Sequence, residues 1–160
     1  MVESVAVSGV IRTLSLVKKL SETAEISISI KNNSFHTLSN VITYTNGTSI
    51  DAINPIIAPY TNPPPVRFET NLRGTMGMLC YQIEGTSYYL LISWKVPLLS
   101  IRRRNQFCVH VCESPLPEEQ KEKNLFFKHV HKKYKKFSEQ SIQWLNNNDM
   151  IIVNVTMSNR

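Results

Sequence analysis

The chain has 160 residues, of which 42% are hydrophobic, and its formal net charge at pH 7 is +6. This length suits a single domain over residues 1–160 with a core that needs no disulfides, and three cysteines argue against a complete disulfide framework. No apolar run reaches the roughly 20 residues of a membrane-spanning helix, and the positive charge favours anionic partners: phospholipid surfaces, nucleic acid or acidic glycans.

The first predicted element is an amphipathic helix over residues 4 to 20, within an N-terminal segment 1–22. Polar and basic residues such as Arg12 and Lys18 take much of one side. Apolar residues recur on the other side at spacings of three and four, the period of one helical face. They are Val7, Val10, Ile11, Leu14, Val17 and Leu20. The segment is a poor signal peptide, because its positive charge follows the apolar part instead of preceding it.

Strands are predicted next. Ile26, Ile28 and Ile30 alternate with polar residues, which indicates a strand with one wet face. "LSNVITYT" is typical of a second strand. The stretch "INPIIAPYTNPPPVRFET" carries five prolines, which do not fit a central strand, so we expect a loop or an edge connection there.

The second half predicts a hairpin, a third strand, a helix and a closing strand. "MGMLCYQI" and "YYLLISWKV" flank the four-residue turn "EGTS", "FCVHVCE" follows, and "MIIVNVTM" closes the chain. From Pro117 to Phe137 the period becomes helical, with Phe126, Val130 and Tyr134 on one face and lysines around it. This order predicts a mainly β chain, a β-sandwich with two peripheral helices.

Two short patterns lie in the hairpin. A Gly-x-x-Gly-x-x-x-Tyr strand precedes the turn, and the strand after it ends in an aromatic, any residue, Val-Pro. The residues concerned are Gly74, Gly77, Tyr81, Trp94, Val96 and Pro97. In this respect "GTMGMLCYQIEGTSYYLLISWKVP" resembles the central hairpin of the actinoporins, the sea-anemone pore-forming cytolysins, and of their actinoporin-like relatives. "YTNGTS", "QKEKNLFF" and "MIIVNVTM" resemble further segments of that family.

The resemblance implies an actinoporin-like β-sandwich flanked by two α-helices, the N-terminal amphipathic helix and a lysine-rich helix near 117–137. It also implies a secreted toxin that binds membrane lipid, in an anionic or sphingolipid-containing bilayer. Members of the family dock through aromatics that take a phosphocholine headgroup. Their N-terminal helix then enters the bilayer, and several copies form a homo-oligomeric, cation-conducting pore, which causes cytolysis and hemolysis.

The family's headgroup positions can be carried over residue by residue. They fall on Asn46, Met76, Lys95, Pro97, Arg102, Arg103, Arg104, Gln106, Phe107, Phe126 and Phe127. Most of the aromatic cage is replaced: Arg103 stands where a pocket tyrosine would be, and Gln106 and Phe107 occupy a tryptophan pair. Arginines repel a choline cation. The sequence therefore predicts a preference for an anionic surface, where each basic residue is worth about 1 kcal/mol.

Two further readings stay open. Residues 2–20 as a helix would span about 28 Å, close to the roughly 30 Å hydrocarbon core, but Arg12, Lys18 and Lys19 suit a cation pore poorly. A helix that stays packed on the sandwich fits equally, and so does a non-lytic, lectin-like module that binds lipid or glycan. The predicted basic helix is either an anionic-lipid surface or a solvated face. Its lysines are Lys128, Lys132, Lys133, Lys135 and Lys136.

Other classes of function are not supported by the sequence. Cys108, His110 and Cys112 share one face of a strand, but the two cysteines would be about 13 Å apart, too far for one zinc ion. We find no nucleophile elbow, phosphate loop or paired carboxylates, so we expect neither an enzyme nor a cofactor. Nucleic acid is the weaker candidate partner. We expect a secreted or peripheral membrane protein, with cytoplasmic storage before release as the alternative to a signal peptide.

Overall fold

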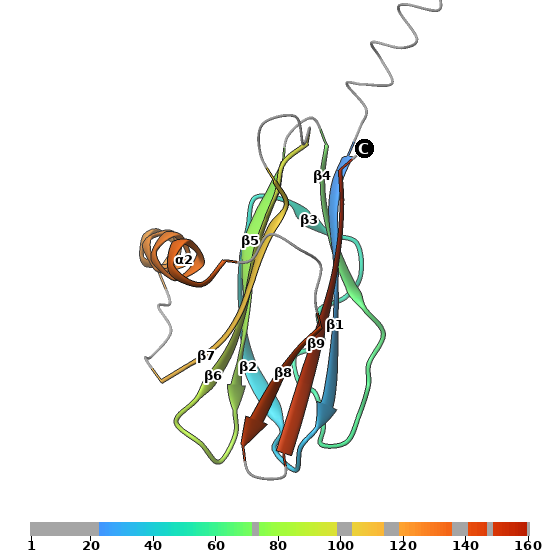
Figure 1. Cartoon of the computed structure of the whole chain (residues 1–160), viewed down its shortest axis with the longest axis vertical. Coiled ribbons are helices and arrows are strands. Elements are labelled where there is room, and N and C mark those ends of the chain that lie inside the picture. Colours follow the sequence, from blue (N-terminus) through green and yellow to red (C-terminus); the bar gives the residue numbers. More distant parts are fainter. Residues whose placement is uncertain are drawn as a thin grey trace, which may run out of the picture.

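The computed structural model describes residues 23–71, 74–98, 104–113, 119–135, 141–146 and 149–159. Within these ranges the chain is mainly β and forms two antiparallel sheets that pack face to face (Figure 1). One sheet has the order β3-β4-β1-β9-β8 and the other has the order β2-β5-β6-β7. The strands are β1 (Thr23–Asn33), β2 (Leu38–Thr45), β3 (Thr48–Ser49), β4 (Val66–Asn71), β5 (Thr75–Ile83), β6 (Tyr89–Val96), β7 (Gln106–Cys112), β8 (Ser141–Asn146) and β9 (Asp149–Asn159).

The main core fills the space between the two sheets. In β1 the alternating isoleucines Ile26, Ile28 and Ile30 all point inward, as their period of two predicts. The other sheet contributes Trp94 and Phe107 to this core, and both are fully buried. Because Trp94 and Phe107 are paired across β6 and β7, they form one continuous apolar layer. Strand alternation in the sequence thus translates directly into the inner face of each sheet.

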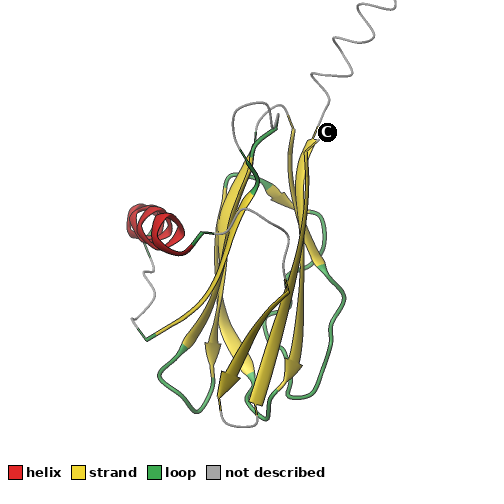
Figure 2. Cartoon of the chain, in the orientation of Figure 1, coloured by secondary structure: helices red, strands yellow, loops and turns green. Residues whose placement is uncertain are grey.

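A single helix, α2 (Gln120–Tyr134), lies within the described residues and covers the outer face of the four-stranded sheet (Figure 2). Its buried residues Phe127, Val130 and His131 are spaced by three and four, so they form one helical stripe. A second apolar cluster joins Phe127 and Val130 to the sheet. The sheet contributes Met78, Cys80, Leu91 and Cys108.

None of the helical structure in the described ranges is both long enough and apolar enough to cross a bilayer.

Several predicted elements are confirmed and others need correction. The hairpin turn is confirmed, with Gly85 in a left-handed conformation at φ +79°. The stretch "VRFETN" was expected to be loop or edge, but it forms β4, which lies between β3 and β1. The prolines end at Pro65, so they do not interrupt its ladder. Strands β3 and β8 were not predicted, and the N-terminal helix expected over 4–20 lies outside the described residues.

Candidate functional site

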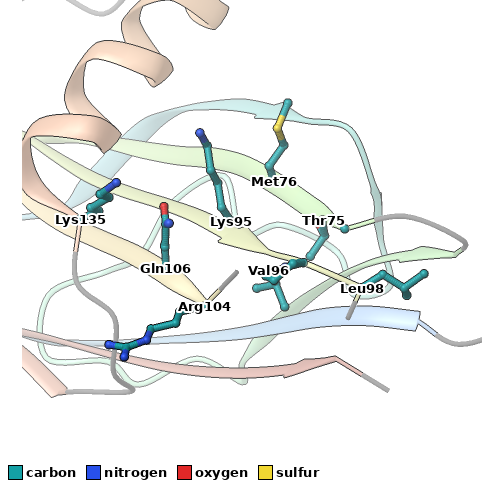
Figure 3. A pocket seen from close by; sticks show the side chains of 10 residues that line it. Thr75, Met76, Lys95, Val96, Leu98, Arg104, Gln106 and Lys135 are labelled. Carbon is teal, nitrogen blue, oxygen red and sulfur yellow. The ribbon is translucent and has the colours of Figure 1, made fainter. Parts of the chain in front are cut away.

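An open hollow lies at one end of the four-stranded sheet, where β5 begins, β6 ends and β7 begins. Its volume is about 560 Å³. Lys135, the residue that directly follows α2, lines it from the helix side (Figure 3). The lining residues are Gly74, Thr75, Met76, Lys95, Val96, Pro97, Leu98, Arg104, Gln106 and Lys135. The hollow is therefore built by three neighbouring strands and the end of one helix.

A row of three side chains crosses the floor of the hollow. Met76 on β5 pairs with Lys95 on β6, and Lys95 pairs with Gln106 on β7. Residues that are paired in register point to the same face of a sheet. Figure 3 shows the three side chains extending to the same side. The strand register thus brings an apolar group, a cation and a carboxamide into one line.

Three of the ten lining residues are cations, and none of those ten is acidic. Lys95 comes from β6, Arg104 from the segment before β7, and Lys135 from the end of α2. The ammonium of Lys95 lies 5.6 Å from the centroid of the Phe127 ring, within the range of a cation–π contact. Cations from three separate segments therefore line one open site.

Asn46 shapes the wall of the hollow instead of lining it. Its side-chain nitrogen donates to the carbonyl of Gly74 at 3.0 Å, and its side-chain oxygen accepts from the backbone N–H of Met76 at 2.8 Å. A Cβ on Gly74 would lie 2.7 Å from the carbonyl oxygen of Val96, closer than real Cβ contacts. The wall can therefore approach the end of β6 only because residue 74 is glycine.

A buried polar chain connects Gln106 to the interior. Nε2 of His131 lies 3.1 Å from Oε1 of Gln106, and Nδ1 of His131 lies 2.8 Å from Oγ of Ser93. Ser93 is 0% exposed and His131 is 1% exposed. Burial lowers the pKa of His131 to about 4, and the charges of Lys95 and Lys135 act in the same direction. The imidazole is therefore neutral near pH 7.

Five of the predicted headgroup residues meet in the hollow: Met76, Lys95, Pro97, Arg104 and Gln106. Lys135, expected as part of the basic helix, joins them. Lys128, Lys132 and Lys133 lie exposed on α2. Arg102, Arg103 and Lys136 lie outside the described residues, as do the expected pore-helix positions from Val7 to Leu20.

The expected exposure of Phe107 and Phe127 at the headgroup site is wrong. Phe107 is 0% exposed and packs in the core between the sheets, because its neighbour Gln106 takes the outer face and strand residues alternate. Phe127 is 1% exposed beneath α2, with its ring 5.6 Å from that of Tyr44. Phe126 is half-buried against the same cluster. In this structure Phe107 and Phe127 cannot contact a bilayer surface.

Sequence reasoning missed Ser93 and His131. Ser93 is a lone hydroxyl within the apolar run "YYLLISWKV", and a buried hydroxyl needs a hydrogen-bond partner. His131 follows Phe127 by four positions, which places it on the buried stripe of the helix. Either signal predicts a buried polar contact, although neither identifies the other residue.

The "CVHVC" strand has ordinary packing roles. Cys108 is buried under α2, and the ring of His110 stacks on Tyr134 with centroids 3.7 Å apart. Burial raises the pKa of the neighbouring Cys80 thiol well above its usual value, which makes it a weak nucleophile. Across the described ranges, no three His, Cys, Asp or Glu side chains gather closely enough to hold a metal ion.

No family model and no curated protein matches this chain.

The motif residues of the hairpin have clear structural roles. Gly77 pairs with Trp94, and a Cβ at Gly77 would lie 2.6 Å from the indole ring. The indole N–H donates to Oγ1 of Thr75 at 3.3 Å. The hydroxyl of Tyr81 donates to the carbonyl of Asn54 at 2.7 Å, which ties the hairpin to the proline-rich loop. The motif thus fixes the strands that end at the hollow.

Proposed function

We propose that this chain is an actinoporin-like membrane-binding protein whose hollow receives an anionic lipid headgroup. The observation that carries the proposal is that Lys95, Arg104 and Lys135 all line one open hollow of about 560 Å³. An open site of this size suits a small headgroup. Its position at the end of the sandwich leaves the sheets and the helix intact when a surface approaches.

The chemistry of the lining favours anions over choline. A choline cation requires aromatic faces, and the aromatic side chains at the carried-over positions Phe107 and Phe127 are buried. Each basic residue close to an anionic leaflet contributes about 1 kcal/mol of attraction to its phosphate and carboxylate groups. Three cations therefore supply on the order of 3 kcal/mol, roughly a hundredfold in affinity.

The exposed lysines of α2 support the approach to such a surface. Lys128, Lys132 and Lys133 are exposed on the helix that carries Lys135 at its end. Basic residues on a helix attract an anionic leaflet over about a Debye length, so they raise the local concentration of the protein before any headgroup is bound.

Vesicle sedimentation tests this proposal. The wild type should bind vesicles of phosphatidylcholine with phosphatidylserine and bind pure phosphatidylcholine much more weakly. The double variant Arg104→Glu with Lys135→Glu should lose most of that binding. Lys121→Glu with Lys132→Glu is the control, because it changes the net charge by the same amount at exposed positions of α2 that do not line the hollow, so it should lose less of the binding. Equal binding of the wild type to both lipid compositions would contradict the proposal.

Pore formation is a second, separable part of the proposal. We propose that residues 1–20 enter the bilayer after docking and that several copies assemble there. Dye release from anionic vesicles should vanish when residues 1–20 are removed, while sedimentation of the truncated chain persists. Binding without dye release by the full chain would contradict the pore and favour a non-lytic lipid- or glycan-binding module.

A further inference from the structure

We infer that His131 orients the carboxamide of Gln106 so that the hollow offers hydrogen-bond donors, and that the hollow selects phosphate groups without an accompanying ammonium. Phosphomonoesters are the matching chemical class, whether they are carried by a lipid or free in solution. The inference rests on the proposed function, because it concerns which anion the same hollow takes.

The placement of Oε1 beside the imidazole is the basis of the proposed orientation. Oε1 of Gln106 can only accept, so Nε2 of His131, 3.1 Å away, must carry the ring proton. A neutral imidazole has one N–H, so Nδ1 is an acceptor and the hydroxyl of Ser93 donates to it. The Ser93 hydroxyl, both ring nitrogens of His131 and Oε1 of Gln106 then each have a hydrogen-bond partner. The opposite orientation of Gln106 would require the tautomer protonated on Nδ1, with Ser93 accepting from the ring and Gln106 donating to Nε2, so the tautomer distinguishes the two orientations.

In this orientation the NH₂ group of Gln106 is the group available to a ligand in the hollow. With Oε1 held by His131, the remaining hydrogen-bonding group of this lining side chain is its NH₂. The heads of Lys95, Arg104 and Lys135 also only donate. The hydroxyl oxygen of Thr75, the remaining polar side chain among the described lining residues, already accepts from the indole of Trp94. The polar side chains therefore match a ligand made of acceptors.

This lining distinguishes between anionic headgroups of equal net charge. A phosphate group presents only oxygen acceptors, and each can receive a charge-assisted hydrogen bond. Phosphatidylserine carries an ammonium beside its phosphate and carboxylate, so binding it brings a fourth cation among three. Phosphatidylglycerol has the same net charge without an ammonium. Attraction to a charged surface alone treats these two lipids alike, whereas the hollow does not.

The first experiment compares vesicles of phosphatidylcholine that contain equal mole fractions of phosphatidylserine, phosphatidylglycerol or phosphatidic acid. We expect phosphatidylglycerol to be bound about fivefold more tightly than phosphatidylserine, the effect of roughly one unfavourable charge near the surface. Phosphatidic acid should be bound most tightly. Equal binding of all three overturns this inference but leaves the proposed function intact. No binding above pure phosphatidylcholine overturns the proposed function itself.

Inorganic phosphate separates the two sources of the ligand. Displacement of wild-type protein from phosphatidic acid vesicles at constant ionic strength shows that the hollow takes free phosphate as well. Retention on those vesicles shows that it requires the lipid-borne group. Either result is compatible with the phosphate preference if phosphatidic acid is bound most tightly. The inference is overturned if the Gln106→Glu protein behaves as the wild type does.

Variants of the polar chain test the role of His131 as a positioning residue. Gln106→Glu keeps an oxygen to accept from His131 but replaces the donor that faces the ligand, so the preference for phosphatidic acid should be lost. His131→Leu should lose it as well, because Gln106 can then rotate. His131→Gln places an amide N–H near the former Nε2 and should restore it. Ser93→Ala leaves the His131–Gln106 contact in place and should retain it.

Nitrogen NMR of the imidazole gives a readout that a purely structural role would not move. We expect the tautomer of His131 protonated on Nε2 at pH 7, in the wild type and in Ser93→Ala. A tautomer protonated on Nδ1 overturns the inference, because Gln106 would then have to donate to the ring. Thermal unfolding of every variant confirms that the compared proteins are folded.

Discussion

The two faces of the sheet β2-β5-β6-β7 are built from the same strands but serve different ends. The inner face presents large side chains such as Tyr81, Trp94 and Phe107 to the other sheet. The outer face presents smaller side chains, among them Cys80, Ser93 and Cys108, together with Met78 and Leu91, to α2. The inner face packs against the other sheet and the outer face is covered by α2, while residues of both faces, such as Val96 and Lys95, line the hollow. The largest apolar side chains are therefore concentrated on the inner face, and the outer face carries the row Met76, Lys95 and Gln106 of the proposed site.

The largest effect that this comparison predicts is on the inner face. Trp94→Ala should lower the free energy of unfolding by about 3–5 kcal/mol, because it empties a fully buried site between the sheets. Cys108→Ala, equally buried on the outer face, removes far less apolar volume and should cost about 1 kcal/mol. Urea denaturation measures both. Equal losses for the two variants would break the distinction between the faces.

The next effect distinguishes the outer face by its pH dependence. The pKa of His131 falls from 6.5 to about 4 on folding, so between these values the unfolded chain binds more protons. Its contribution to stability is complete above pH 6.5 and declines as pH falls towards 4. The total is roughly 3 kcal/mol.

His131→Gln removes this titration while keeping an amide in the site. The free energy of unfolding of the variant should therefore fall less between pH 7 and pH 4.5 than that of the wild type. The difference between the two proteins isolates His131 from the other histidines. Parallel pH profiles would mean that the imidazole is not held neutral by the outer face.

The inner face could largely be predicted from the sequence, because alternation of apolar residues determines which side of a strand is buried. Ile26, Ile28 and Ile30 illustrate this. Strand β4 was not foreseen, since the prolines before Val66 obscured a strand that starts only after them. Strand β4 is held by its pairing with β1, and such a long-range contact cannot be predicted from the local sequence pattern.

The candidate site could be predicted only in part. Met76, Lys95 and Gln106 were found by position, and register explains why they meet. Phe107 was assigned to the same surface as Gln106, although adjacent strand residues face opposite sides, so that error was avoidable. The contact of His131 with Ser93 could not be predicted, because nothing in the sequence specifies which strand residues α2 covers.

A smaller effect tests how the wall of the hollow depends on one loop residue. Asn46→Ala removes two hydrogen bonds to the backbone at Gly74 and Met76 and should lower the free energy of unfolding by about 2 kcal/mol. Asn46→Asp retains the acceptor for the N–H of Met76 but places a carboxylate oxygen against the carbonyl of Gly74, so a loss at least as large is expected. If Asn46→Ala weakened vesicle binding without any loss of stability, Asn46 would contact the headgroup after all.

The smallest effects separate the hollow from the exposed face of α2 by their response to salt. Lys132→Gln removes one charge from the last turn of α2, and Lys135→Gln removes one charge from the residue that follows it. Each substitution should weaken binding to anionic vesicles about fivefold at low salt. Lys132 is exposed, whereas Lys135 is half-buried and lines the hollow. The Debye length falls from about 10 Å at 0.1 M salt to about 3 Å at 1 M.

Salt should therefore abolish the effect of Lys132→Gln and leave most of the effect of Lys135→Gln, since a contact made within the hollow is shorter than the screening length. Vesicle sedimentation across a salt series measures both variants beside the wild type. If the two effects decline together, Lys135 acts only through the general positive field of the helix. The hollow would then have no role in binding, and the exposed lysines of α2 would account for the attraction to anionic vesicles.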